Sequence, residues 1–369
     1  MPFEQLDRSR IRMKPLAERA NRVNIERDAV EPGQRPRALS RAARQVVAET
    51  ARRILMARRA GRPVIMAFGA HTIKNGLAPV LIHLMHHGRL THLATNGAGI
   101  IHDWEFAFQG ESSEHVRENV AAGTFGVWEE TGYCLNLALL VGAYRGLGYG
   151  ESIGAMIQAE ALEIPSRGQL RQEIAQGLVQ KPLPERACAA ADLLWAMDRF
   201  GLEPGSVQIP HPFKRYSVQA AAYRMEIPLT GHPMIGHDVI YLHPLNHGGA
   251  IGRTALRDFL SFAHGISELS GGVYLSIGSA VMSPMIFEKS MSMAQNLALQ
   301  KGERMERHFI VVVDLAESTW DWQKGEPPET HPDYYLRYCK TFQRMGGEVR
   351  YACADNRDFL LALCRELER

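Results

Sequence analysis

The sequence predicts an α/β protein of the Rossmann-like class, with a mostly parallel sheet that helices cover on both faces. Short apolar runs without polar alternation, such as residues 63–68 and 308–313, are typical of strands buried on both faces. Helical patterns separate these runs along the chain. Glycines or acidic residues follow several of the runs, as a shared ligand-binding edge of a parallel sheet requires.

Residues 1–62 are predicted to form a basic, partly helical N-terminal extension. Prolines and a glycine interrupt residues 1–37, whereas Ala43, Val47 and Ile54 mark one face of a helix over about 40–60. The extension holds 16 Lys and Arg against 7 Asp and Glu, so it carries +9 and the rest carries −7. It lacks the aromatic interleaving and zinc spacing of a nucleic-acid-binding arm. We therefore expect no nucleic-acid partner, and an arm folded over the body or over a neighbouring subunit.

The next segment predicts a strand, a helix and a second strand. Residues 63–68 form the first strand and residues 91–95 the second, and an apolar stripe over 77–85 predicts a helix with Pro79 in its first turn. The crossover between parallel strands is right-handed, which places the loops after both strands at the same sheet edge. Ligands bind at that edge in open α/β sheets.

A glycine loop follows the second strand, with the sequence Asn96-Gly97-Ala98-Gly99. Glycines there would let backbone N–H groups approach a pyrophosphate. The GxGxxG dinucleotide fingerprint is incomplete, because its last position is His102. The loop therefore indicates a nucleotide site, and an ordinary glycine turn is the alternative.

The remaining chain alternates in the same way after a helical insertion at about 133–205. Short helices are expected at 100–108 and 114–122, with Ser112-Ser113 as an N-cap. From Gly205 the alternation resumes, so residues 63–369 are expected to form one domain around one sheet. The expected strands are 207–209, 227–229, 272–277, 308–313 and 348–352, and the expected helices are 217–225, 249–263, 285–299, 333–345 and 356–367.

The composition indicates a globular cytoplasmic protein. Apolar residues make up 46% of the 369 residues, and no run approaches the roughly 20 apolar residues of a membrane span. The first ten residues carry charges where a signal peptide needs an apolar stretch. Five cysteines without a CxxC pair argue against a disulfide framework and against a zinc knuckle.

Histidines, carboxylates and one lysine are the candidates for chemistry. Histidines crowd two stretches, but no carboxylate or cysteine completes a ligand set, so we expect no metal site. Carboxylates that follow strands would attract a cation, although helix capping is the better reading for Asp333. Lys340 points away from the apolar face of a regular helix over 333–345, which is formed by Tyr335, Cys339 and Phe342 with two neighbours. A solvated lysine is the simple reading, whereas a nucleophile needs a desolvated pocket.

Six segments in a fixed order resemble deoxyhypusine synthase and the related bacterial homospermidine-forming enzymes. They are FGAHTIKNG, THLATNGAGIIHD, YSVQAAAYRMEIPLTG, GVYLSIGSAV, HFIVVVDLAE and PDYYLRYCK, and they cover roughly residues 63–365. The resemblance implies a Rossmann-like domain that binds NAD, in a homotetramer with sites between subunits. It also implies an NAD-dependent transfer of an aminobutyl group from a small, polyamine-like amine, with a lysine imine as the covalent intermediate.

The resemblance also implies roles for individual residues. The implied NAD-binding residues are Gly69, Ala70, His71, Thr72, Thr95, Asn96, Gly97, Ala98, Asp238, Gly278, Ser279, Ala280, Leu315, Ala316 and Asp355. The implied substrate-binding residues are His102, Asp103, Asp314, Asp333 and Tyr338. Lys340 is the implied covalent carrier, and His237 is a candidate for acid–base chemistry.

Several positions depart from the family pattern. His102 replaces a substrate-binding glutamate, Tyr334 replaces a second glutamate, and the catalytic histidine falls on Met282-Ser283-Pro284. The fold and the cofactor therefore carry over better than the substrate. Two alternatives stay open: an NAD-dependent oxidoreductase on another substrate without a covalent step, and a non-catalytic member of the family with an assembly or regulatory role.

Overall fold

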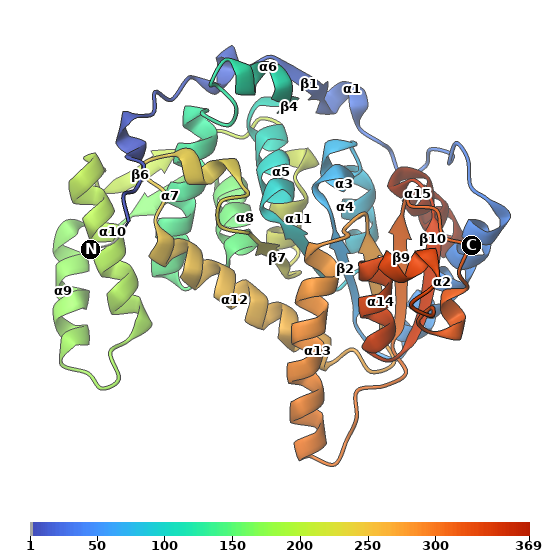
Figure 1. Cartoon of the computed structure of the whole chain (residues 1–369). Coiled ribbons are helices and arrows are strands. Elements are labelled where there is room, and N and C mark those ends of the chain that lie inside the picture. Colours follow the sequence, from blue (N-terminus) through green and yellow to red (C-terminus); the bar gives the residue numbers. More distant parts are fainter. Residues whose placement is uncertain (1–2) are drawn as a thin grey trace.

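A six-stranded parallel sheet forms the centre of the computed structural model, which describes residues 3–369 (Figure 1). The spatial order of the strands is β10-β9-β8-β2-β3-β7, and every neighbouring pair is parallel. In chain order the strands are β2 (Val64–Phe68), β3 (His92–Asn96), β7 (Leu229–His232), β8 (Val273–Ile277), β9 (Phe309–Asp314) and β10 (Glu348–Cys353). Counted along the chain, this is the 3-2-1-4-5-6 order of Rossmann folds. The predicted fold class is confirmed.

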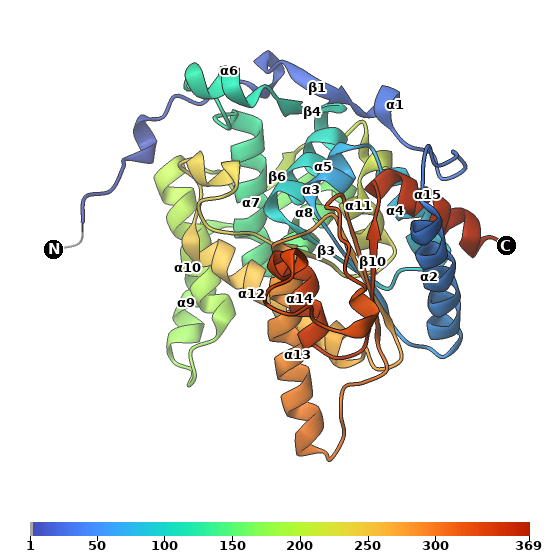
Figure 2. The ribbon, with the colours of Figure 1, turned by 45° about the vertical axis from the view of Figure 1, so that its right-hand side comes forward.

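Helices cover both faces of the sheet (Figure 2). One face packs against α12 (Gly248–Ser267), α13 (Met282–Gln300) and α14 (Arg337–Arg344) through a core that includes Phe262, Phe287 and Phe342. The other face packs against α2 (Arg41–Arg59), α4 (Ala78–His86), α5 (Gly97–Gln109), α11 (Val218–Arg224) and α15 (Asn356–Leu367). Strands β2 and β8 bury all of their residues, which explains why β2 is an uninterrupted apolar run and β8 is apolar except for Ser276.

The helical insertion packs beside β7 at one end of the sheet (Figure 1). It comprises α7 (Glu129–Arg145), α8 (Tyr149–Ala159), α9 (Arg167–Leu178) and α10 (Glu185–Phe200). A two-stranded antiparallel ribbon joins β5 (Ala161–Ile164) to β6 (Gly205–Gln208). The strand predicted at 207–209 therefore lies outside the main sheet, where the alternation resumes only at β7. The prediction that this strand belongs to the main sheet is wrong, because a short polar strand has no sequence pattern that identifies its partner.

The N-terminal extension folds over the body of its own chain, which confirms that expectation. Strand β1 (Asn21–Asn24) pairs with β4 (Glu111–Glu114), so Ser112 and Ser113 lie in a strand and the predicted N-cap is wrong. Arg19 forms an ion pair with Glu105 at 2.7 Å, with 4% and 2% of the two side chains exposed. Short helices complete this region and the loop after β2: α1 (Ile25–Asp28), α3 (Ala70–Lys74) and α6 (Val116–Ala121).

The sequence predicted one regular helix over residues 333–345, and this prediction is wrong. A 3-10 turn, η6 (Pro332–Tyr335), precedes α14, and Leu336 breaks the helix with φ −71° and ψ 72°. The break turns Tyr335 outward, so its side chain is 75% exposed and does not join Cys339 and Phe342 in the core. Along residues 3–369, no helix has a stretch that is long and apolar enough to cross a bilayer.

Candidate functional site

The turns after β2 and β8 lie against each other at the centre of the sheet edge. The N–H of Gly69 donates to the carbonyl oxygen of Ile277 at 3.0 Å, and the N–H of Gly278 donates to Val313 at 2.9 Å. A Cβ atom on Gly69 would lie 2.1 Å from the carbonyl oxygen of Gly278. These strands are the first and fourth in chain order, so they flank the switch point where Rossmann folds bind dinucleotides.

The loop after β10 reaches the same two turns. A Cβ atom on Gly278 would lie 2.3 Å from the amide nitrogen of Asn356, and Gly278 has φ +56°, a conformation that favours glycine. The same amide lies 3.4 Å from Thr72 Oγ1. Asn356 thus joins three loops. The sequence did not predict this role, and it gave the neighbouring Asp355 as the residue near NAD. Asp355 is exposed, and it caps α15 by accepting from the N–H of Arg357 at 2.8 Å.

The glycines after β3 lie in the first turn of α5. The side chain of Asn96 caps this helix by accepting from the N–H of Gly99 at 2.9 Å. A Cβ atom on Gly97 would lie 2.2 Å from a carboxylate oxygen of Asp238, and one on Gly99 would lie 2.2 Å from Thr95 Oγ1. Gly97 therefore makes room for a carboxylate that comes from the loop after β7. Ala98 is half-buried beside it.

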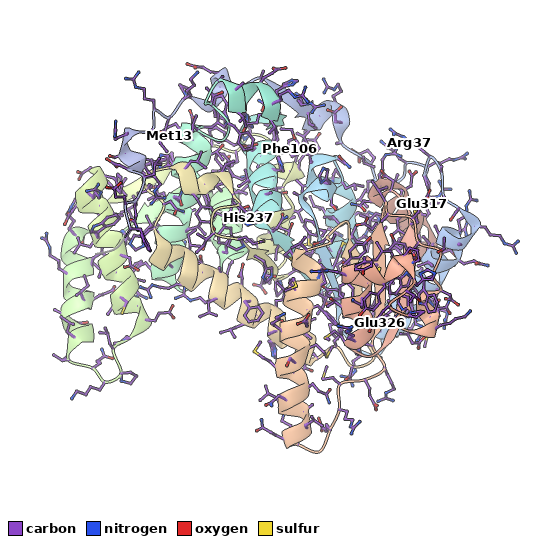
Figure 3. All side chains as sticks on the ribbon, in the orientation of Figure 1. Met13, Arg37, Phe106, His237, Glu317 and Glu326 are labelled. Atoms are coloured by element: carbon purple, nitrogen blue, oxygen red, sulfur yellow. The ribbon has the colours of Figure 1, made fainter. Side chains whose placement is uncertain are left out.

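Asp238 lies on the loop after β7, the third strand of the sheet in chain order, and its carboxylate lies against Gly97 at the end of β3, the second strand. It is 8% exposed, and burial raises its pKa to about 6. In many Rossmann folds a carboxylate in this part of the fold accepts hydrogen bonds from a ribose hydroxyl. His237, labelled in Figure 3, is its exposed neighbour on the same loop.

The turns after β8 and β9 are also held in place. Ser279 Oγ accepts from the N–H of Ser283 at 3.1 Å, at the start of α13, and Ala280 is exposed. Asp314 accepts from the N–H of Ala316 at 3.1 Å. The hydroxyl of Tyr351 on β10 donates to the carbonyl oxygen of Ala316. Leu315, which lies between Asp314 and Ala316 in the sequence, is 70% exposed.

Asp103 lies inside the protein, where its carboxylate holds two helices together. It is 2% exposed and accepts hydrogen bonds from Ser217 Oγ at 2.6 Å, from the N–H of Val218 at 2.8 Å and from the side-chain amide of Gln219 at 2.9 Å. These donors belong to the start of α11. Burial raises the pKa of Asp103. The structure therefore gives the carboxylate a structural role between α5 and α11.

His102 is held next to the buried ion pair of the N-terminal extension. Its Nδ1 lies 2.7 Å from Ser112 Oγ, which donates to Glu105 at 2.5 Å. Burial lowers the pKa of His102 to about 4, with His71 and Lys74 among the nearby charges that act in the same direction. His102 is consequently neutral near pH 7. A general acid or base works best at that pH when its pKa is close to 7, so His102 is poorly suited to this role.

The remaining predicted residues lie around η6 and α14. Asp333 accepts from the N–H groups of Thr319 and Trp320, each at 2.8 Å, and so fixes the loop after β9. Tyr338 is half-buried, and burial raises its pKa to about 12. The ammonium of Lys340 lies 3.5 Å from the centre of the Tyr334 ring. Within residues 3–369, no side-chain hydrogen bond or ion pair joins Lys340 to the turns at Gly69 and Gly278.

Metal ligation has no support in the part of the chain that the structure describes. No group of three or more His, Cys, Asp or Glu side chains is arranged there to hold an ion. Four cavities of the molecule have linings that do not include Gly69, Gly97 or Gly278. The candidate site is defined by the loops that converge at the sheet edge.

Comparisons with known proteins give only distant likenesses. No family model matches the sequence, and no curated protein does. Unliganded AgrE has a TM-score of 0.45 at 14% identity over 90% of this chain and 33% of its own. A candidate LOR/SDH protein from Methanococcus maripaludis S2 has 0.45 at 12%, over 92% of this chain and 72% of its own. A candidate deoxyhypusine synthase from Entamoeba histolytica has 0.38 at 9%, over 88% and 87%.

These likenesses do not assign a function. The chain spans about a third of the length of AgrE and of the cyanobacterial arginine dihydrolase ArgZ, which it matches with a TM-score of 0.41.

Proposed function

We propose that the chain is an NAD-dependent enzyme that binds the dinucleotide across the carboxyl ends of β2 and β8. The observation that carries the proposal is the contact between Gly69 and Gly278 at the switch point of a sheet with Rossmann strand order. Two glycine turns at this point leave backbone, and not side chains, facing a ligand. NAD, when bound, would supply a hydride acceptor.

The surrounding residues fit a dinucleotide. Gly97 leaves space for the Asp238 carboxylate, which would accept a hydrogen bond from a ribose hydroxyl. Small side chains at Ala98 and Ala280 flank the turns without filling them. One AgrE structure is a complex with ornithine and NAD+.

The finer proposal is a transferase that acts on a small amine, with Lys340 as the covalent carrier. It is supported by the order of the six sequence segments, in which Lys340 keeps its spacing from Pro332-Asp333. The covalent step would require the Lys340 amine to leave the Tyr334 ring and lose its proton. The contact with Tyr334 favours the second candidate, an NAD-dependent oxidoreductase on a small substrate without a covalent intermediate.

One experiment separates these proposals. The protein is incubated with NAD and a panel of small amines, borohydride is added, and the adduct is located by peptide mass spectrometry. A stable adduct on Lys340 that disappears in Lys340→Arg supports the transferase. Turnover that survives in Lys340→Ala excludes a covalent role for this residue and leaves the oxidoreductase. Absence of NAD binding in calorimetry would contradict both and favour a non-catalytic role.

We also propose that the chain forms a homo-oligomer. The apolar side chains Leu256 and Leu260 on α12 and Met285 and Leu297 on α13 are each about half exposed. Helix α13 extends beyond the sheet in Figure 1. Exposed apolar side chains on two neighbouring helices are candidates for contact with a second copy of the chain. Sedimentation of the wild type and of Leu260→Glu tests this: a smaller species in the variant supports the proposal, and a monomeric wild type contradicts it.

A further inference from the structure

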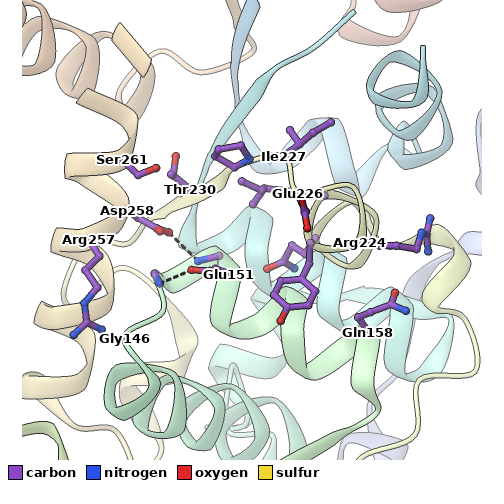
Figure 4. A pocket seen from close by; sticks show the side chains of 17 residues that line it. Gly146, Glu151, Gln158, Arg224, Glu226, Ile227, Thr230, Arg257, Asp258 and Ser261 are labelled. Carbon is purple, nitrogen blue, oxygen red and sulfur yellow. Dashed lines mark hydrogen bonds between the residues drawn. The ribbon is translucent and has the colours of Figure 1, made fainter. Parts of the chain in front are cut away.

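A cavity of about 770 Å³ lies on the far side of β7 from the glycine turns. Its walls come from α8, α11, α12 and the start of β7, where Pro228 and Leu229 line it (Figure 4). The glycine turns follow the carboxyl ends of the strands, whereas these residues precede or begin β7. The cavity is therefore separate from the proposed dinucleotide site.

Gln219 brings an unpartnered acceptor to this cavity. Its side chain is 2% exposed, and its amide nitrogen donates to the carbonyl oxygen of Ile100 at 3.1 Å and to Asp103 at 2.9 Å. Two acceptors around the nitrogen fix the orientation of the amide. The amide oxygen is buried and has no hydrogen-bond partner among residues 3–369. A buried acceptor left unpaired costs about 1–3 kcal/mol, so a donor from a ligand would be favourable here.

Other groups that line the cavity also favour a ligand that donates hydrogen bonds. The buried amide oxygen of Gln158 also has no partner in the described chain. Three carboxylates also line the cavity. Glu226 is exposed, Glu151 accepts from the N–H of Gly148 at 3.2 Å, and the buried Asp258 accepts from the N–H groups of Gly150 and Gly231. The ring of Tyr223 offers a surface on which a cation can stack.

Two arginines, Arg224 and Arg257, also line the cavity. Arg257 is engaged, because it donates to the carbonyl oxygens of Ala143 at 3.2 Å and Leu147 at 3.0 Å and pairs with Glu185 at 2.9 Å. Arg224 is exposed to solvent. The groups left to meet a ligand are therefore the unpaired amide oxygens of Gln158 and Gln219 and the exposed carboxylate of Glu226.

We infer that this cavity is a second binding site, for a small organic cation that carries N–H donors, such as an amine or a guanidine. The amide oxygens of Gln158 and Gln219 would accept its N–H groups, and Glu226 with Glu151 would balance its charge. The inference does not depend on NAD binding, because no residue of the cavity belongs to the glycine turns.

Calorimetric titration with agmatine, a linear molecule with a guanidinium at one end and an ammonium at the other, tests the inference on the full chain. Glutarate, a linear dianion of similar length, is the comparison ligand. We expect agmatine to bind and glutarate not to bind. Failure of agmatine to bind at millimolar concentration, or equal binding of glutarate, would overturn the inference.

Variants place the binding in the cavity. Gln158→Leu removes one free acceptor, and Glu226→Gln removes a charge without changing the shape. Each is expected to weaken agmatine binding about tenfold. Glu163→Gln changes an exposed carboxylate outside the cavity and is expected to leave the affinity unchanged. Gln219 is not varied, because its amide nitrogen also holds Asp103. Equal affinity in all three variants would place the binding elsewhere and overturn the inference.

Discussion

Gly69 and Gly278 face each other so closely that a Cβ atom on residue 69 would lie 2.1 Å from the carbonyl oxygen of residue 278. The contact joins the turns after the first and fourth strands of the sheet. Both turns also extend the strand ladder by one hydrogen bond each, to Ile277 and Val313. The two loops at the switch point thus form one continuous backbone surface, on which the proposed NAD site depends.

Gly69→Ala is expected to damage this surface. The obstacle is backbone and not a flexible side chain, so the turns must move apart, at about 1–3 kcal/mol. The φ of Gly69, −80°, suits alanine, so sterics alone cause the effect. Urea unfolding should show the loss, and calorimetry should show weaker NAD binding. Gly33→Ala is the control, because a Cβ atom there meets no described atom within 4 Å. Equal stability of the two variants would contradict the account.

Gly97→Ala is expected to weaken NAD binding more than it destabilises the fold. The nearest atoms to the new Cβ atom would be those of the Asp238 carboxylate, the closest at 2.2 Å, and that side chain can rotate away. The proposed contact with the ribose would be lost. Gly248→Ala is the matched control, since both glycines open a helix and the Cβ atom on residue 248 meets no described atom within 4 Å. An unchanged NAD affinity in Gly97→Ala would exclude a role for Asp238 in binding.

Asp258 is expected to make the stability depend on pH. Its carboxylate is 4% exposed and accepts from the N–H groups of Gly150 at 2.8 Å and Gly231 at 2.6 Å, and burial raises its pKa from 3.8 to about 7. Between these values the folded state binds the proton and the unfolded state does not. The free energy of unfolding should therefore fall as the pH rises from about 4 to 7, by up to roughly 4 kcal/mol.

Asp258→Asn removes this titration and should flatten the profile of stability against pH. Glu31→Gln, which changes an exposed carboxylate, should leave the profile as in the wild type. The measurement is urea unfolding at a series of pH values. A wild-type stability that rises through this window, or a variant profile that matches it, would contradict the assignment.

Arg19→Met should destabilise the protein by about 3–5 kcal/mol, because it leaves the buried Glu105 carboxylate without its partner. The double change Arg19→Met with Glu105→Leu should recover much of the loss. Arg27→Met is the control, since Arg27 pairs with Asp28 at the surface, where such pairs contribute about 0–1 kcal/mol. Similar losses for Arg19→Met and Arg27→Met, measured in urea, would refute the buried pair as an anchor of the extension.

The sequence allowed the central sheet to be predicted because its inner strands are buried on both faces. Such strands, β2 and β9 above all, are short apolar runs, and the loops that follow them had to meet at one edge. The pairing of β1 with β4 could not be predicted in this way, because both are short, polar strands at the surface. Their contact lies between distant segments and leaves no periodic pattern.

Parts of the candidate site could not be predicted from the sequence for similar reasons. Nothing in the residues near Asp103 shows that its carboxylate would be enclosed by donors from α11. The break at Leu336, which separates η6 from α14, could not be predicted, because residues 333–345 contain no proline or glycine. Asn356 was missed because its role comes from Gly278 and Thr72, which reach it only in the folded chain.

Hydrogen exchange of the backbone amides with and without NAD tests the central claim most directly, because it reports where the dinucleotide binds without requiring a substrate. The account predicts slower exchange on addition of NAD in three segments, residues 69–74, 96–99 and 278–283, which come from three different loops of the same sheet edge. Protection confined to other parts of the chain, or no change in these three segments at saturating NAD, would contradict it.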